Sequence, residues 1–181
     1  MRGAEAVIIP VEFLGRNLLK KERVKKTYRI KEIDTELRVG RTRREARLLH
    51  KAKLAGVKCP TVYEVGIDYL IMDKISGRKL RGDSEELKEA GEVLGALHAA
   101  GIIHGDFTPY NIIVNSSGIF VIDFGLGSFS KKVESQADDV ITMLRGIEGK
   151  KQFIAGYKKF SGSREVLKRI EKIESRARYR S

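Results

Sequence analysis

The sequence has a single cysteine, Cys59, so it forms no internal disulfide and holds no cysteine-based zinc cluster. No uninterrupted apolar run exceeds six residues, even when glycine and proline are counted, which excludes a transmembrane helix within these residues. The first fifteen residues lack a charged segment followed by an apolar stretch, because Pro10 and Glu12 interrupt them. A secretory signal is therefore not expected. We expect a cytoplasmic protein.

The chain has 181 residues, of which 41% are hydrophobic, enough for the packed core of one domain. Its formal net charge of +12 is unevenly spread. Residues 16–51 carry 14 basic and 5 acidic side chains, residues 150–181 carry 11 and 3, and the stretch 52–149 carries 10 and 14. Two basic regions flanking an acidic middle are suited to a polyanion such as nucleic acid or nucleotide phosphates. The alternative is a solvated basic surface.

Hydrophobic periodicity and turn residues predict strands first and mostly helices afterwards. We expect an N-terminal strand pair, with Thr42 and Ser84 as the N-caps of the first two helices. This order indicates an α+β fold with the strand-rich part at the N-terminus. The predicted strands span 7–13, 17–22, 62–65, 69–72, 112–114 and 120–122, and the predicted helices span 42–55, 84–101, 135–147 and 163–178.

The segment HGDFTPYN at 104–111, followed by DFG at 123–125, has the residue types that phosphoryl transfer from ATP requires. Asp106 can orient or deprotonate an attacking hydroxyl. Asn111 and Asp123 supply the hard oxygen donors that Mg²⁺ prefers. The alternative is that these polar side chains only cap turns. The order and spacing instead resemble the catalytic loop and metal-binding motif of protein kinases, in which the histidine, here His104, is a packed core residue.

A kinase site also needs a cation on the phosphates, held by a carboxylate from a helix. Lys20 and Lys21 both end the second predicted strand, and strand alternation favours Lys21 as the one that faces the cleft. Glu45 is the expected partner in the following helix. Its other interpretation is a capping box, because it lies three residues after Thr42.

The glycine-rich loop that usually covers the nucleotide is missing. One glycine, Gly3, stands at the start, followed by Ala4, so backbone amides can approach phosphate only there. The segment from Met72 through Asp73 to Ile75 is predicted to join two lobes and to hydrogen-bond adenine through its backbone. Met72 would line the pocket, although it can equally be ordinary core.

Several further segments match one family across nearly the whole chain. They are GAEA at 3–6, YR at 28–29, RT at 41–42, EAR at 45–47, IHGD at 103–106, IDFGL at 122–126 and the arginine-rich end RARYR at 176–180. In these motifs the chain resembles the small atypical kinase of the KEOPS complex in its archaeal, single-domain form.

The resemblance implies a minimal two-lobed protein-kinase-like fold with an N-lobe at about 1–72, a hinge at 73–76 and a C-lobe at 77–181. It implies an ATPase and Ser/Thr kinase that binds Mg-ATP and supports tRNA threonylcarbamoyladenosine modification. The implied partners are the synthase subunit, a small accessory subunit and tRNA. By resemblance Asp106 is catalytic, Lys21 pairs with Glu45, and Asn111 and Asp123 bind Mg²⁺. The same resemblance assigns the tail residues Arg176, Arg178 and Arg180 to tRNA or the synthase subunit.

The chain departs from regulated protein kinases in ways that bear on activity. Gly105 replaces the arginine before the catalytic aspartate, and Thr108 replaces a phosphate-contacting lysine. No Ala-Pro-Glu motif follows. We therefore expect ATP hydrolysis or self-phosphorylation to exceed transfer to free peptides. The remaining alternatives are a RIO-type kinase, which normally carries an extra N-terminal module, a small-molecule phosphotransferase, and a non-enzymatic RNA-binding pseudokinase.

Overall fold

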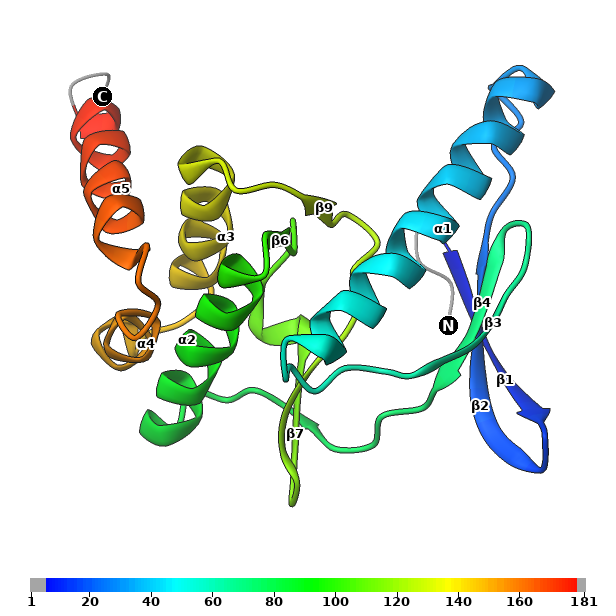
Figure 1. Cartoon of the computed structure of the whole chain (residues 1–181), viewed down its shortest axis with the longest axis horizontal. Helices are drawn as coiled ribbons and strands as arrows, with labels where there is room; N and C mark the ends of the chain where they lie inside the picture. The colour runs from blue at the N-terminus through cyan, green and yellow to red at the C-terminus, as the bar shows by residue number, and fades with distance from the viewer. Residues whose placement is uncertain (1–5, 179–181) are drawn as a thin grey trace.

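The computed structural model describes the backbone of residues 6–178 and the side chains of residues 6–175. A four-stranded antiparallel sheet in the order β1-β2-β4-β3 forms one end of the molecule (Figure 1). It consists of β1 (Ala6–Phe13), β2 (Arg16–Arg23), β3 (Val62–Val65) and β4 (Tyr69–Asp73). These four strands were predicted to within two residues at each end. The turn between β1 and β2 places Leu14 and Gly15 at positive φ, as a two-residue hairpin turn requires.

The first helix, α1 (Lys31–Leu54), is 24 residues long and begins eleven residues before the predicted start at Thr42. Thr42 is therefore not an N-cap but a buried residue inside the helix, and Glu45 cannot complete a capping box. The first turns of α1 are stabilised by ion pairs rather than by a stripe of buried apolar side chains. The buried carboxylate of Asp34 accepts a hydrogen bond from Arg38 at 2.8 Å and lies 3.7 Å from Arg29.

Beyond β4 the chain passes into a helical half (Figure 1). It contains α2 (Ser84–Ala99), α3 (Val133–Arg145), α4 (Lys150–Tyr157) and α5 (Ser163–Arg178). The predicted cap at Ser84 is wrong by one residue, because the Asp83 side chain accepts from the backbone N–H of Glu85 at 3.0 Å. The helix α4 was not predicted.

Short strands complete this half. They are β5 (Arg78–Lys79), β6 (Ile102–Ile103), β7 (Ile112–Asn115), β8 (Gly118–Val121) and β9 (Ser128–Phe129), with a 3-10 turn η1 (Pro109–Asn111) before β7. The β7–β8 hairpin was predicted, although β8 begins two residues earlier and ends one residue earlier than expected. It joins β5 in one small sheet, and β6 pairs with β9 in another. These pairs frame the loops at 104–111 and 122–127.

One apolar core runs through both halves and joins α1, β4 and the helices α2, α3, α4 and α5. It includes Leu48, Leu70, Leu94, Phe124 and Tyr157. The predicted apolar face of the last helix is confirmed at Val166 and Ile170, which are buried.

Cys59 is buried and unpaired, and burial raises the pKa of its thiol to about 11. Among the described residues, no helix is both long and apolar enough to cross a membrane.

Candidate active site

Three predicted side chains from distant parts of the chain meet at the centre of the molecule. Lys21, on β2, donates from Nζ to Glu45 Oε1 at 2.5 Å and to Asp123 Oδ1 at 2.7 Å. Glu45 lies in the middle of α1 and is 2% exposed. The second Glu45 oxygen accepts from Arg23 Nη2 at 2.6 Å, a partner that the sequence did not indicate. Lys20 points elsewhere, pairing with Glu22 and lying 4.4 Å from the centre of the Tyr69 ring.

The loop after β8 is shaped around this cluster. Asp123 adopts a positive φ of 61°, which is unusual for a residue with a side chain. Its Oδ1 also accepts the backbone N–H of Gly125 at 3.1 Å. A Cβ on Gly125 would lie 3.0 Å from Asp123 Oδ1 and 3.3 Å from Lys21 Nζ. The glycine therefore leaves room for the cation and the carboxylate to approach each other.

The predicted catalytic loop has its own internal hydrogen bonds. Asn111 Nδ2 donates to Asp106 Oδ2 at 2.8 Å and to the Asp106 carbonyl at 2.9 Å. The Asn111 carbonyl accepts from the Ile122 N–H at 2.9 Å, and His104 Nε2 lies 3.1 Å from the Ile122 carbonyl. Both bonds tie the loop to the residue directly before Asp123, so the two motifs are held together.

The loop is also held by a residue on α3, Asp139, that the sequence analysis did not single out. Asp139, on α3, is 2% exposed and accepts the backbone N–H of His104 at 2.7 Å and that of Gly105 at 2.8 Å. Its Oδ2 also lies 3.3 Å from His98 Nε2. The only sequence signal was an aspartate beside Ala137, Val140 and Met143 on the buried face of the helix. Gly105 itself has φ 79° and a Cβ there would lie 2.5 Å from the Leu126 carbonyl oxygen, so this backbone has no room for the arginine of regulated kinases.

The predicted adenine segment lies at the end of β4. Met72 is buried in the core, and the Asp73 side chain accepts from the Thr61 N–H at 2.8 Å and from the Tyr63 hydroxyl at 3.0 Å. The Asp73 N–H donates to the Thr61 carbonyl at 3.0 Å. The Asp73 N–H is therefore engaged within the sheet and is not available to a nucleotide. The predicted contacts Gly3 and Ala4, the side chains of Arg176 and Arg178, and all of Arg180 lie outside the described residues.

Comparison with known proteins identifies the family. Residues 16–146 match the RIO domain. The chain is 39% identical to a probable serine/threonine-protein kinase BUD32 homolog of Archaeoglobus fulgidus, over 98% of this chain and 94% of that protein. It is 38% identical to the KEOPS complex subunit Bud32 of Pyrococcus abyssi, over 99% of this chain and 94% of that one. The chain belongs to the Bud32 family of RIO-domain kinases.

A longer relative agrees with this membership, and a solved structure shares the fold. A probable bifunctional tRNA threonylcarbamoyladenosine biosynthesis protein of Methanothermobacter thermautotrophicus is 41% identical over 98% of this chain, which spans only 36% of that protein. The Rio2 kinase of Chaetomium thermophilum, in a complex with ADP, Mg²⁺ and phosphoaspartate, superposes with a TM-score of 0.69. The match covers 100% of this chain and 70% of the Rio2 chain, at 13% sequence identity. At this low identity it supports the fold alone. The predicted protein-kinase-like α+β fold is confirmed.

Charge governs protonation at the centre of this Bud32-family site. Burial opposes the charged form of Lys21, but the Glu45 and Asp123 carboxylates outweigh it and raise the Lys21 pKa. Partial burial likewise opposes ionisation of Asp123, but the Lys21 ammonium outweighs it and lowers the Asp123 pKa. Both groups are therefore charged at neutral pH.

The residues present fit one Mg²⁺ ion bound through nucleotide phosphates. The Asn111 amide nitrogen donates to Asp106, so the Asn111 side-chain oxygen would be the atom that binds the metal. Mg²⁺ in such sites takes one or two protein oxygens and completes its shell with phosphate oxygens and water. Asp123, whose side chain is 54% exposed, would provide the charged oxygen. Within the described chain, no cluster of three or more His, Cys, Asp or Glu residues competes as a metal site.

Removing the Asp139 carboxylate is expected to loosen the catalytic loop. The Asp139→Ala variant leaves two loop N–H groups without their acceptor, so we expect the free energy of unfolding to fall by roughly 2–5 kcal/mol. Chemical denaturation measures this change. Asp138→Ala, at an exposed neighbour on α3, serves as the control and should shift stability by less than about 0.5 kcal/mol. Equal stability of the two variants would contradict the support role.

Protonation of His104 is expected to destabilise the fold in acid. His104 Nδ1 accepts the Asp106 N–H at 3.3 Å and Nε2 faces the Ile122 carbonyl, an arrangement that suits the neutral ring. Complete burial lowers the His104 pKa below its ordinary 6.5. The unfolded chain therefore takes up this proton first. Stability due to His104 is present above pH 6.5 and is lost as pH falls below it, by at most about 1.4 kcal/mol per unit.

Denaturation at pH 7.5, 6 and 5 tests this expectation. His104→Gln should show a shallower loss of stability with falling pH than the wild type, whereas His50→Gln, at an exposed position, should keep the wild-type slope. Identical slopes in all three proteins would show that His104 does not take part.

Proposed function

We propose that the chain is an ATP-dependent phosphotransferase with ATPase activity, and that it works with Mg²⁺. The observation that supports this most is the convergence of Lys21, Glu45 and Asp123, with hydrogen bonds at 2.5 and 2.7 Å, beside the loop that holds Asp106 and Asn111. These groups come from β2, α1 and two loops of the helical half. No single element of secondary structure would bring them together without the whole fold.

In this proposal each side chain has one role. Lys21 binds the α- and β-phosphates and is kept in place by Glu45. Asp123 and Asn111 hold Mg²⁺, which when bound neutralises charge on the phosphates. Asp106, held by Asn111, orients the attacking hydroxyl or water and accepts its proton. Met72, Asp73 and Ile75 border the adenine, with Gly3 and Ala4 above the phosphates.

We further propose that this activity supports tRNA threonylcarbamoyladenosine modification in the cytoplasm, within a KEOPS complex. Support comes from the Pyrococcus relative, named as a KEOPS subunit, and from the bifunctional relative, named for that modification, in which a chain like this one occupies about a third of the length. The proposed partners are the threonylcarbamoyladenosine synthase subunit, a small accessory subunit and tRNA. The tail residues Arg176, Arg178 and Arg180 are proposed to contact tRNA or the synthase.

Measuring ATP turnover in the purified full chain tests the proposal. Phosphate release should require Mg²⁺, should exceed transfer to generic peptides, and should change when tRNA or the synthase partner is added. The peptide preference follows from Gly105 and Thr108, which stand where regulated kinases have an arginine and a lysine. Turnover that persists in excess chelator would reject the site, and fast transfer to peptides would reject the preference.

A further inference from the structure

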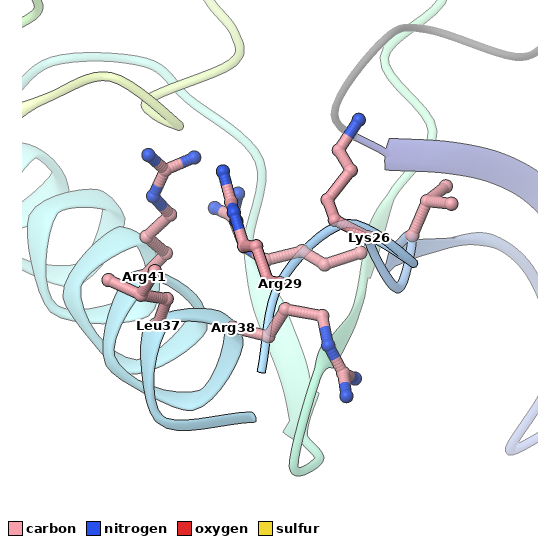
Figure 2. Close-up of a pocket in the computed structure, with 7 residues that line it drawn as sticks. Lys26, Arg29, Leu37, Arg38 and Arg41 are labelled. Carbon is pink, nitrogen blue, oxygen red and sulfur yellow. The ribbon is translucent and has the colours of Figure 1, made fainter. Parts of the chain in front are cut away.

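Three polar side chains from different helices lie beside the catalytic loop. They are Tyr157 on α4, His98 on α2 and Asp139 on α3, and each is at most 2% exposed. The basic hollow between the end of β2 and the first half of α1 is different in kind (Figure 2). Its volume of about 10 Å³ gives room for about one water molecule, which is too little for a ligand. The helix group is instead filled by its own side chains, which bind one another.

Hydrogen bonds connect these side chains in series to the catalytic loop. The Tyr157 hydroxyl lies 2.7 Å from His98 Nδ1, and His98 Nε2 lies 3.3 Å from Asp139 Oδ2. The Asp139 carboxylate accepts the backbone N–H groups of 104–105 at 2.7 and 2.8 Å. These two residues directly precede Asp106, the proposed catalytic residue. The hydroxyl on α4 is thus connected to that residue through two side chains and the loop backbone.

The direction of each hydrogen bond follows from the last acceptor in the series. Backbone N–H groups can only donate, so both oxygens of the Asp139 carboxylate are acceptors. His98 therefore donates to Asp139 from Nε2, and Nδ1 of the neutral ring accepts. The Tyr157 hydroxyl is then the donor to Nδ1. Burial and the Asp139 charge raise the pKa of Tyr157, so this hydroxyl keeps its proton.

Close packing of α2 against α4 holds this series in place. A Cβ on Gly91 of α2 would lie 2.1 Å from a backbone carbonyl oxygen of α4, and one on Gly156 of α4 would lie 1.9 Å from a carbonyl oxygen of α2. The two helix backbones are therefore in direct contact. The His98 and Tyr157 rings meet edge to face, with their centroids 5.6 Å apart. A hydroxyl held against Nδ1 in this way sets which nitrogen of the His98 ring carries the proton.

We propose that Tyr157 and His98 are positioning residues for the phosphotransferase reaction. By fixing the Asp139 carboxylate they fix the backbone that precedes Asp106, and so the direction in which Asp106 faces the attacking hydroxyl or water. This inference rests on the proposed function. The proposed nucleotide contacts are not part of the series. We therefore expect these two residues to affect the chemical step and not the affinity for ATP.

The first test is steady-state ATP turnover in two single variants of the full chain. Tyr157→Phe removes only the hydroxyl. It should lower kcat about three- to tenfold and leave KM for ATP within about twofold of the wild type, because misplaced catalytic groups slow the chemistry without weakening binding. Tyr28→Phe, at a position that is 76% exposed, should leave both constants unchanged. An unchanged kcat in Tyr157→Phe, or a change confined to KM, would overturn the proposal.

Variants at His98 add a rescue test. His98→Gln keeps an N–H donor for Asp139 and should keep more turnover than His98→Leu, which has none. Equal kcat values in these two variants would show that the donor has no part in positioning. If His98→Leu does not fold, His98→Asn, whose shorter side chain moves the donor away from Asp139, gives the same comparison.

Two spectroscopic measurements need no turnover. A proton–nitrogen correlation spectrum of the imidazole rings should show the His98 proton on Nε2 alone, and a proton on both nitrogens or on Nδ1 alone would overturn the direction of the series. Amide hydrogen exchange at 104–105 should be faster in Tyr157→Phe by about threefold or more, and unchanged in Tyr28→Phe. Absent turnover in the wild type would reject the proposed phosphotransferase, whereas unchanged exchange in Tyr157→Phe would by itself reject the positioning role.

Discussion

Replacing Asp123 by asparagine is expected to abolish Mg²⁺-dependent ATP turnover while the fold persists. The substitution keeps the size of the side chain and removes the charge that Mg²⁺ requires. A bound metal is worth several kcal/mol of transition-state stabilisation, so we expect a loss of about 10³-fold in turnover. The Asp123 side chain is 54% exposed, and exposed polar side chains contribute little to folding, so the unfolding transition should move only slightly.

Phosphate release at increasing Mg²⁺ concentrations, with a denaturation curve for each protein, provides the measurement. Asp138→Asn, which removes a charge from an exposed position on α3, should turn over ATP at the wild-type rate. Wild-type turnover in the Asp123 variant would mean that the activity belongs to another site or to a contaminant.

The largest effect on stability is expected at Glu45. Its two oxygens bind Lys21 at 2.5 Å and Arg23 at 2.6 Å, and none of the three side chains is more than 9% exposed. Glu45→Ala leaves buried cations without their shared partner. Breaking a buried ion pair in this way costs about 3–5 kcal/mol, which corresponds to roughly 10 °C in Tm for a chain of this size.

A second variant separates the fold from the activity. Replacing the whole group by apolar residues, as Lys21→Met, Arg23→Leu and Glu45→Leu together, removes the buried charges as well as their partner. Such replacements are often neutral or stabilising, so thermal unfolding should return toward the wild-type Tm while ATP turnover stays absent. Glu36→Ala, at an exposed position on α1, is the control for loss of a carboxylate. A Glu45→Ala protein as stable as this control would contradict the buried-pair account.

The catalytic residues were predictable because much of their geometry is local. Asp106 and Asn111 are five positions apart in one loop, and their hydrogen bond follows from that spacing. Lys21 was separable from Lys20 because a strand turns alternate side chains to opposite faces. The contact between Lys21 and Glu45 depends on the tertiary fold. It could be predicted only from the order of the motifs along the chain.

The features that the sequence did not predict depend on contacts between residues that are far apart in the chain. The first turns of α1 have exposed Ile33 and Leu37 and a buried Asp34, the reverse of an amphipathic pattern, so periodicity placed the helix start too late. Asp139 binds backbone groups 34 and 35 positions away, which no local pattern encodes. Strands β6 and β9 have two residues each and exist only because they pair with one another.

Because α1 is long, a tilt of the whole helix would move its first turn farther than it would move Glu45. Twenty-four residues at about 1.5 Å of rise make a rod of roughly 36 Å, with Glu45 about 14 Å from its far end. A tilt of roughly five degrees about that end moves the first turn by about 3 Å and Glu45 by about 1 Å, by the same rise per residue. A rigid tilt of this kind would therefore displace Glu45, which binds Lys21, about a third as far as the first turn of the helix.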